Sequence, residues 1–126
     1  MVGVNQPEAL ESANFVLTQL LQYLTDQKIP EVERINDFIP TIEKRAKISM
    51  NDYLGKGELT SPQTKTDLYK KYYREFNKDG EEHDRGIRIW NDGSIEIGNF
   101  EDDFLGTGNY IHIYSGGWFQ VGEIYK

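Results

Sequence analysis

Side chains suited to acid–base catalysis are few in this chain of 126 residues, which contains no cysteine and two histidines. His83 lies in the charged run at residues 81–85, and His112 lies between two isoleucines. An imidazole titrates near neutral pH and can act as a general base. These two contexts instead favour a surface or pocket position, so we predict no catalytic histidine.

Carboxylates gather at Glu101, Asp102 and Asp103. Oxygen ligands of this kind suit hard cations, but the run lacks the regular ligand spacing of a calcium loop. A solvated acidic turn is the simpler interpretation. The sequence also contains no nucleophile elbow, P-loop, zinc-peptidase helix motif or EF-hand loop. We therefore predict no catalytic residue, no metal site, no cofactor and a protein that is not an enzyme.

Aromatic residues are the more informative feature. Eight of them crowd the last third of the chain, and period-two alternation along strands can bury only half of such a set. The others must face helices, a partner or another copy, and an exposed aromatic strip can act as a binding hot spot. The predicted partner-binding residues are Trp118, Tyr114, Trp90, Glu101, Asp102 and Asp103.

Negative charge is concentrated in the same part of the chain. Residues 80–126 hold nine acidic and three basic residues, which is −6 of the net −7. Such a field repels phosphate backbones and accelerates encounter with basic partners, so we expect a protein partner with a basic surface and no direct binding of nucleic acid. An acidic surface that serves only solubility is an equal alternative.

Hydropathy and cysteine content bear on location. No apolar run approaches the roughly 20 residues that span a bilayer, and the first ten residues do not have the pattern of a signal peptide. The absence of cysteine fits a reducing compartment. We predict a soluble, cytoplasmic protein without a transmembrane segment.

A repeat of 24 residues organises the aromatic segment. Residues 86–100 align with residues 110–124, which superimposes Ile87 on Ile111 and Gly93 on Gly117. Each unit reads as a β-hairpin in which alternating strands flank a turn with a positive-φ glycine. A partial earlier repeat can be aligned from about Tyr73.

The spacing of glycines and aromatics within this repeat resembles the MORN family. Gly93 is followed by Gly98 and then by Phe100, and a second glycine pair comes at Gly106 and Gly108. The resemblance covers about two repeats, from residue 73 to residue 125. A bacterial variant of the motif, found in small toxin–antitoxin-like proteins, is similar too.

The resemblance implies an elongated antiparallel meander used for protein contacts or, in some members, lipid contacts. Three positions depart from the family pattern. Glu96 and Gln120 stand where an aromatic is usual, and Ile124 replaces the second aromatic.

Helical patterns fill the first half of the chain. A helix is predicted from about Pro7 to Asp26, where Asn5 and Glu8 are spaced like a capping box and leucines form one apolar stripe. A second periodic segment follows Pro30, and Pro40 should either kink it or divide it into two short helices.

A third helix is predicted after Pro62, with Leu68, Tyr72 and Phe76 on one side. Lysines and an arginine surround this stripe, namely Lys65, Lys70, Lys71 and Arg74. An aromatic and basic helix can contact nucleic acid, but beside so acidic a segment a core stripe with solvated lysines is the preferred interpretation.

The order of these patterns predicts an α+β fold: N-terminal helices packed on a C-terminal antiparallel β-meander of about two MORN-like hairpins. Residues 1–78 form the helical region and residues 79–126 the β repeats, with one shared core. The preferred function is a non-enzymatic, acidic protein-binding module, such as an inhibitor, immunity or anti-defence protein that covers a basic site.

Two other functions stay open. The first is a structural or adaptor subunit of a larger assembly, in which the helices dock and the repeat acts as a spacer. The second and less supported one is a small-ligand-binding or hydrolytic protein that uses His112 and the aromatics. A homo-oligomer is left open, and the sequence does not identify the partner.

Overall fold

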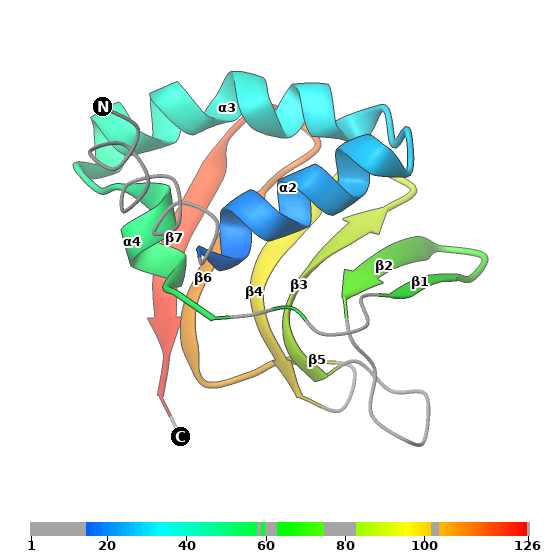
Figure 1. Ribbon diagram of the computed structural model, residues 1–126. Helices are drawn as coiled ribbons and strands as arrows, with labels where there is room; N and C mark the ends of the chain where they lie inside the picture. Colours follow the sequence, from blue (N-terminus) through cyan, green and yellow to red (C-terminus); the bar gives the residue numbers. More distant parts are fainter. Residues whose placement is uncertain (1–14, 58, 60–62, 75–82, 102–103, 126) are drawn as a thin grey trace, which may run out of the picture. The chain divides into compact units, whose positions relative to one another are not determined.

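The chain folds into helices followed by a sheet, as shown by a computed structural model that describes residues 15–57, 59, 63–74, 83–101 and 104–125. Two compact units are present, Met1–Leu59 and Thr60–Lys126. The first contains the described helices and the second a seven-stranded antiparallel sheet, so the predicted α+β class is confirmed (Figure 1). The elements are α2 (Val16–Asp26), α3 (Glu31–Ala46), α4 (Met50–Leu54), β1 (Gln63–Thr66), β2 (Lys70–Arg74), β3 (His83–Trp90), β4 (Ile95–Glu101), β5 (Phe104–Leu105), β6 (Gly108–Ile113) and β7 (Phe119–Ile124).

Helix α2 ends at Asp26, the residue at which the first helix was predicted to end. Its buried residues recur at helical spacing, as the leucine stripe requires: Val16, Leu17, Leu20 and Leu24. The predicted start at Pro7 and the capping box lie outside the described residues. The Gln19 side chain ties the helix to the end of its unit, because its amide nitrogen donates to the Gly57 carbonyl and its oxygen accepts from the Leu59 amide.

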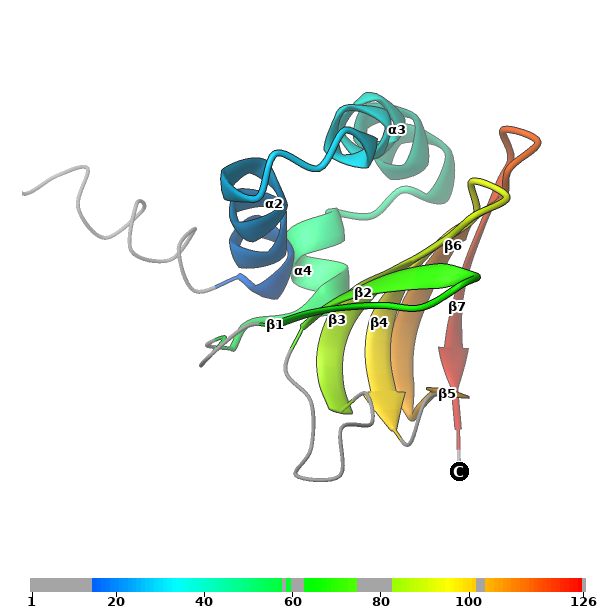
Figure 2. The same cartoon turned by 90° about the vertical axis from the view of Figure 1, so that its right-hand side faces the viewer.

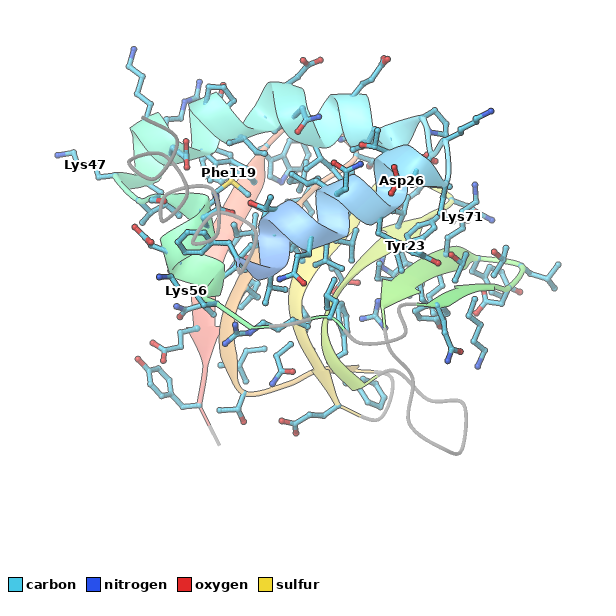
Figure 3. All side chains as sticks on the ribbon, viewed as in Figure 1. Tyr23, Asp26, Lys47, Lys56, Lys71 and Phe119 are labelled. Carbon is cyan, nitrogen blue, oxygen red and sulfur yellow. The ribbon has the colours of Figure 1, made fainter. Side chains whose placement is uncertain are left out.

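The second periodic segment divides after residue 46, and Pro40 does not divide it. Helix α3 continues through Pro40, which is exposed. It ends at Ala46, and its C-cap Lys47 has a left-handed φ of 57° (Figure 3). Ser49 then caps α4 by accepting from the Asp52 amide. A proline inside a helix has no backbone N–H, so one hydrogen bond of the helix is missing. Burial of Ile35 and Ile42 on either side of it stabilises the continuous helix.

The expected third helix is wrong, because strands β1 and β2 occupy that segment. Asp67 sets the turn between them: its Oδ1 accepts from the amides of Tyr69 at 2.7 Å and Lys70 at 2.9 Å. An aspartate that bonds its own following backbone in this way favours a turn over a helix. The two compact units divide after Leu59. The division at residue 79 and the single shared core stay predictions.

The sheet is a meander with the strand order β1-β2-β3-β4-β6-β7, and β5 pairs with β4. Every described pairing is antiparallel. The turns of the three hairpins, β1–β2, β3–β4 and β6–β7, consequently lie at one end of the sheet, which we call the turn end. Figure 2 shows the β3–β4 and β6–β7 turns beside each other.

The 24-residue repeat is visible in the strand register. Ile87 pairs with Ile97 in the β3–β4 hairpin, and Ile111 pairs with Val121 in the β6–β7 hairpin. The predicted turn glycines Gly93 and Gly117 have φ values of 95° and 96°. Both turns are three-residue loops with a left-handed glycine, a type that glycine accommodates without strain. The tandem hairpin pattern therefore corresponds to two hairpins of the same register.

Candidate binding surface

Two rows of side chains cross one face of the sheet next to the turn end. Successive register partners form the first row: Tyr72, Arg88, Glu96, His112 and Gln120. The second row lies nearer the turns and contains Lys70, Trp90, Ser94, Tyr114 and Trp118. We call these ten residues the polar face. Alternation places the isoleucines of the same strands on the opposite face, where they are buried.

A buried ion pair organises the first hairpin. Arg88 Nε donates to Glu96 Oε1 at 2.8 Å, and Trp90 Nε1 donates to the same oxygen at 2.5 Å. The guanidinium lies 5.1 Å from the Trp90 ring centroid and 4.9 Å from that of Phe100. The side chains of Arg88 and Glu96 are only 7% and 11% exposed. Charge pairing, hydrogen bonding and ring stacking together offset the cost of removing both charges from water.

Lys70 contacts this cluster through the Trp90 ring. Its ammonium lies 4.8 Å from the Trp90 ring centroid and 3.4 Å from Asp67 Oδ2. The hydrogen bond with Tyr72 and the charge of Asp67 raise the pKa of Lys70. The backbone amide of Tyr69, and then that of Lys70, lower the pKa of Asp67. Lysine and carboxylate therefore both keep their charges at neutral pH.

The second hairpin repeats this arrangement of contacts with different side chains. His112 stacks on Tyr114 with ring centroids 4.0 Å apart, as Arg88 stacks on Trp90. The Tyr114 hydroxyl donates to Gln120 Oε1 at 2.9 Å, as the Trp90 indole donates to Glu96. Each interacting position is displaced by the 24 residues of the repeat. The side-chain contacts therefore repeat along with the backbone.

Trp118 extends this second network into solvent. Its ring stacks on Tyr114 with centroids 5.7 Å apart, and the residue is 61% exposed. The indole also lies against Gly116, where an added Cβ would come within 2.1 Å of the ring. A glycine at this turn position thus leaves room for the ring. Trp118 is an exposed aromatic that is held in place on two sides.

The six predicted partner-binding residues separate into two groups. Trp90, Tyr114 and Trp118 all lie on the polar face near the turn end. Glu101 ends β4 at the opposite end, about 20 Å away for a strand rising about 3.3 Å per residue. Asp102 and Asp103 lie outside the described residues. The aromatics form one surface, and Glu101 is not part of it.

Several residues of this surface were not expected from the sequence. Arg88 and Glu96 carry opposite charges at register positions across a hairpin, and that spacing is the signal that could have revealed the pair. Lys70 was assigned to a helix, so its position over Trp90 could not be anticipated. His112 is partly buried and stacks on Tyr114. Its non-catalytic role stays a prediction. The side chain of His83 lies outside the described part.

Comparison with protein families, with curated proteins and with solved structures finds no match for this chain. The resemblance to the MORN family stays a prediction. Among the described residues, no three His, Cys, Asp or Glu side chains are grouped as they would be around a metal ion. In the same part of the chain, no helix has the length and apolar character needed to cross a membrane.

Proposed function

We propose that this chain is a non-enzymatic protein-binding module, and that the polar face contacts a partner with a basic surface. The observation that carries this proposal is the stack of His112 and Tyr114 with the exposed Trp118 at the turn end. Aromatic side chains supply large contact areas with few rotatable bonds, and they often dominate binding energy. Here the stack is already held in place.

The first hairpin indicates which chemistry suits the second. Trp90 has the cations of Lys70 and Arg88 at 4.8 and 5.1 Å from its ring. Tyr114 occupies the equivalent position, with Trp118 exposed beside it. An incoming lysine or arginine would find there the kind of cation–π contact that the first hairpin makes internally. The −6 charge of residues 80–126 would accelerate the approach of such a partner.

The same contacts argue against a hydrolytic role. The carboxylate nearest in register to His112 is Glu96, whose Oε1 already accepts from Arg88 and Trp90. A carboxylate oxygen that already accepts two hydrogen bonds is less available to orient an imidazole, as a catalytic triad requires. Inhibitor, immunity or anti-defence proteins that cover a basic site are the types of binding module that fit this chemistry best.

Affinity capture from native lysate followed by surface plasmon resonance tests the proposal. Trp118→Ala should raise the dissociation rate of the captured partner at least tenfold, and Gly116→Ala should act in the same direction by displacing the ring. Phe104→Ala is the matched control, because this exposed aromatic lies at the other end of the sheet. A charge-neutral triple change at Glu101, Asp102 and Asp103 should lower only the association rate and its salt dependence.

Binding that survives these changes would refute this use of the polar face. Loss of binding on altering Lys65 and Lys71 instead would assign the contact to the part of the β1–β2 hairpin that lies outside the polar face. If the wild-type chain captures no partner that depends on Trp118, the proposed function itself fails.

A further inference from the structure

We infer that the outer edge of β7 is a docking strand, to which an extended, basic segment of a protein partner adds as a further antiparallel or parallel strand. This inference rests on the proposed function and names the way in which the partner is held. β7 is the last strand in the sheet order, and no other described strand pairs with its outer edge.

The two edges of the sheet differ in how they are protected. β1 has four residues, all polar and exposed, and Lys65 lies among them. Short edge strands carrying lysine resist pairing with other chains. β7 has six residues, with Phe119, Val121 and Ile124 as β-forming residues and no lysine or proline. β1 therefore has the features that discourage strand addition, and β7 lacks them.

The hydrogen-bond pattern identifies the groups that point outward from β7. The Tyr114 amide donates to the Trp118 carbonyl at 2.8 Å, so these two residues form a hydrogen-bonded pair. Bonded and non-bonded pairs alternate along an antiparallel ladder. Phe119, Val121 and Glu123 therefore direct their N–H and C=O groups away from β6. They repeat every second residue, which is the spacing that an added strand requires.

An exposed aromatic residue lies at each end of strand β7. Trp118 precedes β7 and is 61% exposed, and Tyr125 follows it and is 80% exposed. The Tyr125 hydroxyl donates to a Glu123 carboxylate oxygen at 2.8 Å, a hydrogen bond that raises the pKa of Tyr125. Peptides added to a sheet edge gain affinity from the main chain and specificity from side-chain contacts at intervals. Trp118 and Tyr125 can supply such contacts at the two ends.

The negative charge around this edge favours a basic partner segment. Glu123 lies on the edge strand itself, and residues 80–126 carry a net charge of −6. A second copy of the chain would bring the same −7 charge, which opposes self-association. A segment rich in lysine or arginine is complementary to this edge, and its cations can stack on Trp118 as Lys70 stacks on Trp90.

A capped synthetic peptide of alternating lysine and valine, Lys-Val-Lys-Val-Lys-Val, is the probe for this site. When it is added to the full chain, amide hydrogen exchange should slow at Phe119, Val121 and Glu123, by tenfold or more at saturation. A peptide with alternate N-methylated amides cannot form the ladder and should bind at least tenfold more weakly. A glutamate-for-lysine peptide should not bind measurably. Equal binding of the N-methylated peptide would overturn the inference without any change to the protein.

Proline substitution provides the matched test on the protein side. Val121→Pro removes an outward N–H and no bond to β6, so the chain should fold and lose at least tenfold in affinity for the peptide. Thr66→Pro removes an outward N–H from the protected edge and should leave peptide binding unchanged.

Two further outcomes would overturn the inference. A concentration-dependent dimer that Val121→Pro abolishes, measured by sedimentation, would make a second copy the occupant. A captured partner that depends on Trp118 but tolerates Val121→Pro would refute the docking strand and leave the proposed function standing.

Discussion

The buried ion pair of the first hairpin provides the sharpest test of the energetics. Arg88→Met would remove the cation and leave the Glu96 carboxylate 11% exposed, with the Trp90 indole as its remaining donor in this network. Breaking a buried pair from one side costs about 3–5 kcal/mol, because one charge stays desolvated and uncompensated. At an m value of about 1.5 kcal/mol/M, the lower figure shifts the urea midpoint by about 2 M.

The second hairpin suggests the compensating change. Gln120 accepts from Tyr114 at the position equivalent to Glu96, without a charge. Arg88→Met combined with Glu96→Gln should therefore keep an acceptor for the Trp90 indole while removing both charges. We expect the double variant to recover about 1.5 kcal/mol or more relative to Arg88→Met alone, which would appear as coupling in a double-mutant cycle.

Urea denaturation followed by tryptophan fluorescence measures all of these variants. Lys44→Met is the control, since substitution of this exposed lysine on helix α3 should change stability by no more than about 0.5 kcal/mol. Two results would refute the reasoning. One is an Arg88→Met cost below about 1 kcal/mol, as for a surface pair. The other is strict additivity in the cycle.

Three further predictions concern the turns and the sheet. Gly93→Val or Gly117→Val should each cost about 1–3 kcal/mol of strain at φ near 95°, and unchanged denaturation midpoints in both would contradict this. The fragment 79–126 should give disordered amide spectra, because it lacks β1 and β2 and exposes the edge of β3; sharp, dispersed signals would show that it folds alone. Asp67 has a lowered pKa, so its turn should be most stable above the ordinary aspartate pKa and lose protection as pH falls through the lowered value. An NMR titration of the Asp67 carboxyl at or above 3.8 would disprove that assignment.

Local patterns predicted much of the fold. The end of the first helix at Asp26 follows from its apolar period. The paired turns at Gly93 and Gly117 follow from a repeat that can be read directly in the chain. Such features depend on neighbours within a few residues, and short-range sequence contains that information. The α+β class follows because the helical and the alternating patterns occur in separate parts of the chain.

Pattern alone misassigned the segment around Leu68. Its four-residue spacing to Tyr72 fits a helix, but the Asp67 turn and pairing with β3 make it a hairpin, and Leu68 is 82% exposed. Residue spacing contains no information about the stability that pairing with a neighbouring strand gives to a turn. It therefore cannot decide between a hairpin and a helix of similar propensity.

Only the tertiary structure could decide which residues share the candidate binding surface, for the same reason. The sequence identified Trp118, Tyr114 and Trp90 as aromatic candidates, and it added Glu101 as an acidic residue of the same repeat segment. Strand register decides which side chains share a face and which end of a strand they occupy. Strand register separates Glu101 from the aromatics and brings the Arg88–Glu96 pair into contact with Trp90. The reason is that pairing partners are set by contacts between strands and not by distance along the chain.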